Sequence, residues 1–247
     1  MNAIETTGLT KRFRGRTAVE DLNLAIAQGE FFALLGQNGA GKTTTIRMIT
    51  CLLAPSAGDA FLMGESISRN AEAAKAHSNL SPQETAIAQN LTVRENLMLI
   101  ARLYGANKAD AAGRAEAAMR EFGLSARARD RAKTLSGGMQ RRLSIAMALI
   151  TKPNVLFLDE PTLGLDVRAR RELWKTISAL KGKVTVVLTT HYLEEAEALA
   201  DRIGIMHEGR LQALGTAAAL CAETNTTNFE DAFLTLTESE SEKEAAL

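Results

Sequence analysis

The sequence predicts an α/β fold with a helical insertion, and three patterns support this prediction. Residues 31–35 form an uninterrupted apolar run that enters a glycine-rich turn, and residues 42–53 continue with apolar residues at helical spacing. Residues 155–158 and 184–188 are continuous runs rich in valine and leucine, as expected of parallel strands covered by helices on both faces. Residues 84–150, in contrast, carry helical patterns and no convincing strand.

The segments that flank these runs complete the α/β body. Near the N-terminus, residues 3–26 include apolar side chains in near alternation from Val19 to Ile26, which predicts half-buried antiparallel strands. Residues 168–180 predict a crossover helix that ends at Gly182.

The insertion contains two clear helix patterns. Thr92 and Glu95 form a capping box before a run of apolar residues at helical spacing, and Gly105 supplies a stop. Residues 108–122 predict a second, alanine-rich helix that ends at Gly123.

We therefore expect three parts in this chain. Residues 1–83 and 151–220 form the α/β core with its antiparallel β subdomain, and residues 84–150 form the helical subdomain. Residues 221–247 are expected to be a C-terminal tail, because the sequence turns polar there and residues 238–244 are a charged run typical of a solvated, mobile segment.

Composition excludes several classes of protein. The 247 residues contain 29 lysines and arginines and 29 aspartates and glutamates, so no overall charge would attract nucleic acid or acidic lipid. Cys51 and Cys221 lie far apart and predict neither a disulfide framework nor a zinc site. Because no apolar run reaches about 18 residues, the chain is expected to be cytoplasmic unless a partner holds it elsewhere.

The glycine-rich turn has the spacing of a phosphate-binding loop, Gly36-Gln37-Asn38-Gly39-Ala40-Gly41-Lys42-Thr43, between a predicted strand and a predicted helix. Its glycines let backbone N–H groups turn toward phosphate oxygens, while the lysine would neutralise the β- and γ-phosphates and the threonine hydroxyl would bind Mg²⁺. The core is therefore predicted to be a phosphate-loop NTPase core that binds ATP. The expected nucleotide ligands in this loop are Gly36, Asn38, Gly39, Ala40, Gly41, Lys42, Thr43 and Thr44.

Two adjacent carboxylates follow the strand predicted at residues 155–158. We expect Asp159 to hold Mg²⁺ through its water shell and Glu160 to act as the general base for the attacking water. An acidic pair after a strand can also be a helix cap or part of a solvated loop, but the phosphate-binding loop makes the catalytic interpretation the stronger one.

A second candidate anion site is Leu135-Ser136-Gly137-Gly138-Met139-Gln140. Ser136 can cap the helix that follows, while the N–H groups of Gly137 and Gly138 stay free to face a phosphate. Ser-Gly-Gly also begins ordinary helices. This hexapeptide, however, resembles the signature motif that separates ATP-binding cassette (ABC) ATPases from other phosphate-loop proteins.

The resemblance to the ABC family extends over roughly residues 3–220 and implies further site residues. Phe13 resembles the aromatic residue on which adenine stacks, and Gln83 resembles the hinge glutamine that senses Mg²⁺, the attacking water and the membrane partner. Asp166, in Gly164-Leu165-Asp166, resembles part of the loop through which two cassettes touch, and His191 resembles the switch histidine at the γ-phosphate. One departure is residues 76–81, which are more polar than the family's usual strand there and argue against a strand.

The resemblance also implies how the protein works. Two chains are expected to sandwich two ATP molecules head to tail, and an integral membrane subunit is expected as the partner, which places the chain on the cytoplasmic face of the cell membrane. Residues 229–234 and the segment after His191 resemble bacterial exporter cassettes, so export is favoured. The alternative is a soluble ABC ATPase that drives assembly of a cytosolic complex, as in iron–sulfur cluster assembly.

Overall fold

The computed structural model describes residues 1–238. Its strands are β1 (Asn2–Phe13), β2 (Arg16–Ala27), β3 (Phe31–Leu35), β4 (Ala57–Leu62), β5 (Glu65–Ser66), β6 (Ser78–Ser81), β7 (Val155–Asp159), β8 (Thr185–Thr190), β9 (Arg202–His207) and β10 (Arg210–Gly215). Its α-helices are α1 (Lys42–Ile49), α2 (Ala71–Ala76), α3 (Val93–Leu103), α4 (Lys108–Glu121), α5 (Gly137–Leu149), α6 (Val167–Ser178), α7 (Leu193–Leu199), α8 (Ala217–Thr224) and α9 (Phe229–Thr237). Two short 3₁₀ turns span Ser125–Arg127 and Ala132–Thr134.

The larger sheet has the strand order β10-β9-β3-β8-β7-β6. Every neighbouring pair in it is parallel except β10 and β9, which pair antiparallel. All residues of β3, β7 and β8 are buried, because helices cover both faces of this sheet. The predicted α/β fold is therefore confirmed.

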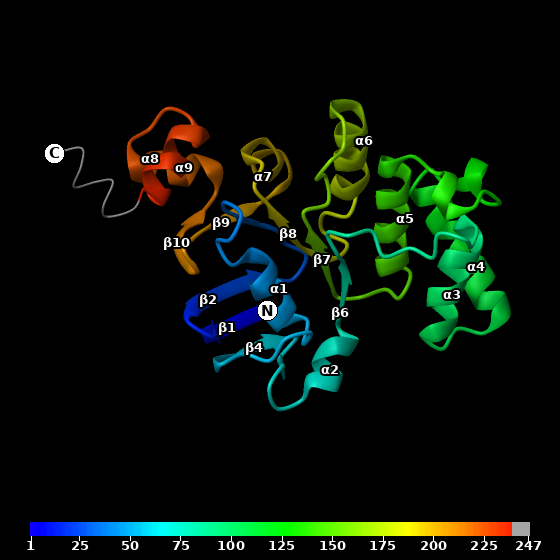
Figure 1. Ribbon diagram of the computed structural model, residues 1–247, viewed down its shortest axis with the longest axis horizontal. Helices are drawn as coiled ribbons and strands as arrows, with labels where there is room; N and C mark the ends of the chain where they lie inside the picture. Colours follow the sequence, from blue (N-terminus) through cyan, green and yellow to red (C-terminus); the bar gives the residue numbers. More distant parts are fainter. Residues whose placement is uncertain (239–247) are drawn as a thin grey trace.

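A second sheet, β2-β1-β4-β5, is antiparallel and lies over α1 (Figure 1). The predicted alternation is present: in β2 the side chains of Val19, Leu22, Leu24 and Ile26 are buried and point toward α1. Helix α1 presents Ile46 to the same cluster. The two sheets thus enclose the helix that begins at the phosphate-binding loop.

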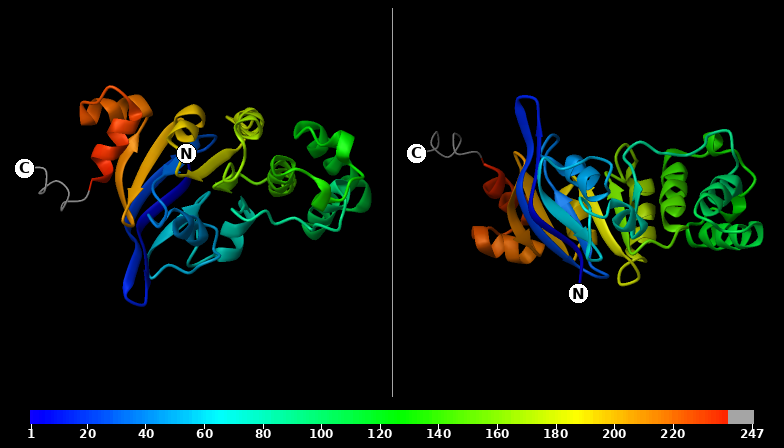
Figure 2. Two further views of the ribbon diagram at one scale, coloured as in Figure 1. Left: turned by 45° about the horizontal axis from the view of Figure 1, so that its top comes forward. Right: turned by 90° about the horizontal axis from the view of Figure 1, so that it is seen from below.

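Helices α3, α4 and α5 gather at one end of the molecule, opposite α8 and α9 (Figures 1 and 2). The predicted capping box is confirmed, since Glu95 N donates to Thr92 Oγ1 at 3.2 Å and Thr92 N donates to Glu95 Oε2 at 2.8 Å. The hydrogen bond that the Thr92 N–H group donates to the Glu95 carboxylate lowers the pKa of Glu95. Leu97, Met119 and Leu143 from the three helices share one buried cluster.

The argument against a strand within residues 76–81 was wrong, because Ser78–Ser81 forms β6 and pairs parallel with β7. The strand lies at the edge of the sheet and has only one neighbour, so polar side chains are tolerated there. Ser81 Oγ lies 3.0 Å from Ser144 Oγ of α5. This hydroxyl pair joins the edge strand to the helical subdomain.

The C-terminal part also differs from the expected tail. Helix α8 continues through residue 221, and α9 buries Phe229 and Phe233 against Leu35, Ile203 and Ile205. The apolar residues of α9 recur at helical spacing, which gives this helix one buried stripe. The charged run predicted at residues 238–244 lies, after its first residue, outside the described part of the chain. The division of the chain into domains stays a prediction.

Within residues 1–238 no helix combines the length and the apolar character that crossing a membrane requires.

Replacing Phe229 with alanine should lower the free energy of unfolding by about 3–5 kcal/mol, because this ring is 4% exposed and its loss leaves a cavity under α9. Leu234→Ala on the same helix is the matched control, since that side chain is 51% exposed and should change stability by about 0.5 kcal/mol or less. Denaturant unfolding measures both. Equal, small losses would show that α9 is not part of the cooperative core.

Candidate nucleotide-binding and hydrolytic site

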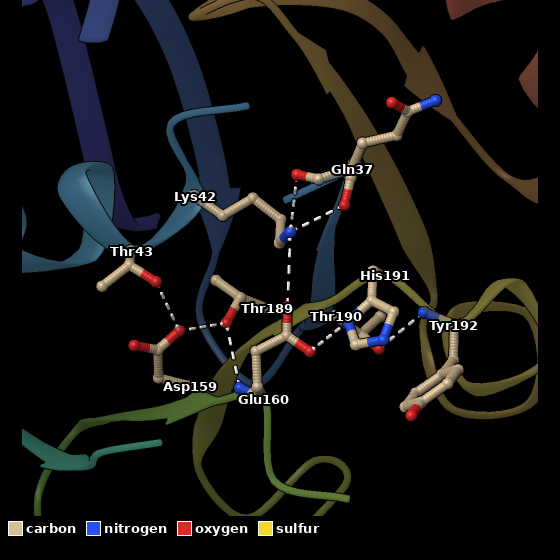
Figure 3. Close-up of polar contacts among 10 residues, drawn as sticks. Gln37, Lys42, Thr43, Asp159, Glu160, Thr189, Thr190, His191 and Tyr192 are labelled. Atoms are coloured by element: carbon tan, nitrogen blue, oxygen red, sulfur yellow. Dashed lines mark hydrogen bonds and ion pairs between the residues drawn. The ribbon is translucent and has the colours of Figure 1, made fainter. Parts of the chain in front are cut away.

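The site lies where β3, β7 and β8 end. These strands are parallel, and Leu35 pairs with Thr190 while Asp159 pairs with Thr189. The phosphate-binding loop, the carboxylate pair and His191 therefore meet at one edge of the sheet (Figure 3). Residues that are more than 100 positions apart in the sequence become neighbours.

The phosphate-binding loop needs its glycines for space. A Cβ atom at Gly36 would lie 2.3 Å from the carbonyl oxygen of Met206, and one at Gly41 would lie 2.5 Å from that of Ala18. Gly41 also has a φ of 106°, which disfavours any residue with a side chain. Helix α1 begins directly after it, so its free N–H groups point at the space above the loop.

Lys42 and Glu160 form a buried ion pair at 3.3 Å, and each side chain is almost fully shielded from solvent. Lys42 Nζ also donates to the carbonyl oxygens of Gly36 at 2.6 Å and Gln37 at 3.1 Å (Figure 3). The second carboxylate oxygen of Glu160 lies 2.6 Å from His191 Nδ1. Glu160 therefore connects the phosphate-binding loop with the end of β8.

Asp159 is held by two hydroxyl groups. Thr189 Oγ1 donates to Asp159 Oδ1 at 2.5 Å, and Thr43 Oγ1 donates to the same oxygen at 3.1 Å. Thr189 Oγ1 in turn accepts a hydrogen bond from the Glu160 N–H group at 3.1 Å. Glu160 has a φ of 48°, in the left-handed region, which turns its side chain away from that of Asp159 toward Lys42.

An open cavity of about 460 Å³ lies against these groups. It is lined by predicted site residues from five segments of the chain: Phe13, Asn38, Gly39, Gly41, Lys42, Thr43, Thr44, Gln83, Glu160 and His191. Gly36 and Ala40 belong to the loop but do not line the cavity. Asp159 does not line it either, but it accepts a hydrogen bond from Thr43, which does. The structure thus brings most of the predicted nucleotide, metal and catalytic residues together.

Phe13 ends β1 at the rim of this cavity, where its side chain is 49% exposed. Lys11 Nζ lies 5.3 Å from the centre of the ring and is itself anchored on the carbonyl oxygen of Ala54. An exposed aromatic ring beside a phosphate-binding loop suits stacking on a nucleobase.

Two arginines at the site were not predicted. Arg16 lines the cavity and donates to the carbonyl oxygen of Gly39 at 3.0 Å, but a single charge after a tight turn carries no sequence signal. Arg141 is buried in α5 and donates to the carbonyl oxygens of Pro82 at 2.6 Å and Gln83 at 2.5 Å. Its place one turn into the signature helix was visible in the sequence, but its backbone partners were not.

Burial lowers the pKa of Arg141, and the charges of Asp159 and Glu195 oppose this shift. The guanidinium group keeps its charge between these two carboxyl groups and fixes the segment that carries Gln83. The hinge predicted at Gln83 is thereby tied to α5.

The signature residues Ser136, Gly137 and Gly138 do not line the cavity of their own chain. Ser136 caps α5, accepting a hydrogen bond from Met139 N at 3.4 Å. Asp166 likewise caps α6, accepting from Ala169 N at 2.8 Å, and a Cβ atom at Gly138 would lie 3.1 Å from the Cβ of Ala169. The signature therefore sits beside the start of α6, away from the phosphate-binding loop.

Residues 19–163, more than half of the chain, match the ABC transporter family, and this match includes the phosphate-binding loop, the signature and both carboxylates. The chain belongs to the ABC transporter family. The predicted family resemblance is thereby confirmed, and the order of motifs along the chain is that of an ABC cassette.

Two curated proteins are similar to this ABC cassette. The chain is 44% identical over 223 residues to the daunorubicin resistance ATP-binding protein DrrA3 of Streptomyces coeruleorubidus, covering 90% of this chain and 71% of that protein. It is 43% identical over 222 residues to the Nod factor export ATP-binding protein I of Paraburkholderia xenovorans, covering 89% and 73%.

Two solved structures share the fold of the cassette. One is an ATP-binding subunit of an ABC transporter, with a TM-score of 0.84 and 30% identity, covering 96% of this chain and all of that one. The other is a dimeric bacterial ABC transporter cassette, with a TM-score of 0.78 and 25% identity, covering 86% and 98%.

Replacing Thr189 with valine should lower the free energy of unfolding by about 1–3 kcal/mol, because Asp159 and the Glu160 N–H group each lose a buried partner. Thr185→Val on the same strand is the control, since that hydroxyl accepts only one bond, from Gly29 N. Denaturant unfolding at neutral pH compares the two variants. A loss for Thr189→Val no larger than that of the control would contradict the described network.

Proposed function

We propose that this chain is the ATP-binding and ATP-hydrolysing subunit of an ABC-type membrane exporter and that it acts as a head-to-tail dimer with ATP at the interface. One observation carries the proposal: Lys42, Glu160 and His191 form a continuous network at the mouth of the phosphate-binding loop, in which Lys42 and Glu160 are buried. A cation for phosphate, a carboxylate for water and an imidazole for the terminal phosphate are the groups that hydrolysis of a phosphoanhydride needs.

ATP would bind with its phosphates on the loop before α1 and its base on Phe13. The N–H groups of the loop and the positive end of α1 supply donors, and the Lys42 ammonium would leave the Gly36 and Gln37 carbonyl groups for the β- and γ-phosphates. Arg16, which already contacts the loop at Gly39, would add a second positive charge toward the phosphates or ribose. Thr44 and Asn38 complete the rim.

The residues at Asp159 fit a magnesium ion. Thr43 and Asp159 place two hard oxygen atoms 3.1 Å apart at the loop, and Gln83 lines the same cavity. A carboxylate, a hydroxyl group and substrate phosphates are oxygen ligands of the kind that Mg²⁺ prefers. When bound, Mg²⁺ supplies charge neutralisation on the β- and γ-phosphates.

In hydrolysis Glu160 acts as the general base. It accepts a proton from the attacking water while the water oxygen bonds to the γ-phosphorus and the bond to the β–γ bridging oxygen breaks. Lys42 contacts one oxygen of the Glu160 carboxylate and His191 contacts the other, so both orient it. Thr189 holds the backbone N–H group of Glu160. His191 would turn from Glu160 to the γ-phosphate when ATP is present.

The position of the signature supports the proposed dimer. Ser136, Gly137 and Gly138 do not line the cavity of their own chain, which agrees with a role in completing a phosphate site on another chain. Asp166, at the exposed start of α6, would touch the second cassette. The solved dimeric cassette supports this arrangement. Closure would be driven by the γ-phosphate, which gains donors from both subunits, and hydrolysis would release it.

The membrane partner and the direction of transport are supported by the relatives. The Nod factor protein is named for export and the daunorubicin protein for resistance, which agrees with an exporter motor held by a membrane subunit on the cytoplasmic face of the membrane. We place the docking site of that subunit between the core and the helical subdomain, near Gln83. These relatives do not favour the alternative of iron–sulfur cluster assembly.

Replacing Glu160 with glutamine should reduce ATP turnover by about 100-fold or more, because the amide cannot accept the proton. Size-exclusion light scattering should show a dimer that forms only with Mg-ATP and persists. Glu194→Gln, an exposed carboxyl three positions after His191, is the matched control and should leave turnover and assembly unchanged.

Normal turnover by Glu160→Gln would refute the catalytic assignment. A variant that loses turnover and stays monomeric with Mg-ATP would refute the sandwich formed by the isolated chain and would direct the search to an obligatory membrane partner.

Cell fractionation distinguishes an exporter subunit from a soluble assembly ATPase. We expect tagged chain expressed with its native partners to sediment with membranes and to copurify with a hydrophobic subunit after detergent extraction. Recovery in a soluble complex that lacks any membrane protein would contradict the exporter.

A further inference from the structure

A third carboxyl group lies behind the catalytic pair. Glu195, in the first turn of α7, is 0% exposed, and its Oε1 accepts a hydrogen bond from the indole Nε1 of Trp174 at 3.0 Å. Its Oε2 is fully buried and has no hydrogen-bond partner within residues 1–238. A buried polar atom without a partner is costly and calls for an explanation.

The surroundings of Glu195 connect it to both catalytic segments. Thr162, two residues after Glu160, is fully buried, and its hydroxyl also has no partner in the described part of the chain. Thr190 directly precedes His191, and its hydroxyl accepts a hydrogen bond from Tyr192 N at 3.0 Å, so it fixes the backbone on both sides of the histidine. The hydroxyl groups of Thr190 and Thr162 each lower the pKa of the Glu195 carboxyl group.

Burial is the main reason why the pKa of Glu195 is raised. Glu160 faces it from the end of β7 and Arg141 from α5, and among the described residues no cation comes within ion-pair distance of it. Burial raises the pKa of Glu195 and the charge of Glu160 adds to the rise, while Thr190, Trp174 and Thr162 oppose it.

We propose that Glu195 is a positioning residue for ATP hydrolysis: its carboxyl group, anchored on Trp174 of α6, fixes the first turn of α7, which follows directly after His191, and thereby holds His191 against Glu160. This inference rests on the proposed function of the site. Glu195 touches neither the cavity nor the reacting atoms, so its effect passes through the first turn of α7. Because β7 and β8 end beside each other, a small shift of the residues after β8 changes the distance between the base and the histidine.

Three variants of the full chain test this role through steady-state hydrolysis of Mg-ATP. Glu195→Ala should lower kcat by roughly 10- to 100-fold with KM changed by no more than about threefold, since catalytic groups are misplaced but the phosphate-binding loop is intact. Glu195→Gln keeps an acceptor for Trp174 and a donor for a hydroxyl, so it should retain kcat within about threefold. Leu199→Ala, a buried truncation on the same helix, should lower the unfolding temperature but not kcat.

The inference is overturned if Glu195→Ala keeps normal turnover, if Glu195→Gln falls as far as Glu195→Ala, or if Leu199→Ala lowers kcat equally. A wild-type chain that neither binds nor hydrolyses ATP would instead overturn the proposed function.

A second measurement does not depend on turnover. Trp174 is the only tryptophan in the sequence, so its fluorescence reports on the contact with Glu195 directly. Addition of Mg-ATP should change the emission of the wild-type chain and of Glu195→Gln and leave that of Glu195→Ala unchanged. The same response in all three chains would refute the coupling.

Discussion

The parallel pairing of β3, β8 and β7 is the constraint on which the rest of the structure depends. A different part of the chemistry lies at or just after the end of each strand, and the register of the strands places Leu35 beside Thr190 and Asp159 beside Thr189. A slip by one residue would turn alternate side chains to the other face of the sheet and would separate the hydroxyl of Thr189 from Asp159. The geometry of the site is therefore a property of the sheet, to which the glycine-rich loop adds donors.

The buried charges of the site are arranged so that none is left alone. Lys42 offsets Glu160 directly, and Arg141 lies near both Asp159 and Glu195 while its N–H groups are bound by backbone carbonyl groups. Removing one partner from such a set leaves an uncompensated charge, which is costly in a protein interior. The set also connects separate parts of the chain, because Arg141 belongs to α5 and Asp159 ends β7. Electrostatic balance and mechanical connection thus depend on the same side chains.

Local patterns in the sequence predicted several of the strands and helices and most of the residues that line the cavity. The glycine-rich loop, the Thr92 capping box and the apolar strands each depend on neighbouring residues, so they can be recognised without knowing the fold. The roles of Arg16, Arg141 and Glu195 depend on groups distant in sequence, and a single charged residue does not reveal its future partner. Strand β6 was missed for the same reason, since its neighbour β7 and not its own composition makes it a strand. The tail was misjudged because a short apolar stripe in α9 is hidden by polar neighbours.

The strand order also has a consequence for how the protein is made. Strand β3 leaves the ribosome early, but both of its neighbours, β8 and β9, belong to the last part of the chain. About 150 residues must be added between Phe31 and its partner Val186, which takes on the order of 10 s at about 5–20 residues per second. During this time a fully apolar strand has no partner, and its later pairing is slow because distant segments must meet. The nascent cassette is therefore a natural client for chaperones, and its nucleotide site is among the last features of the molecule to exist.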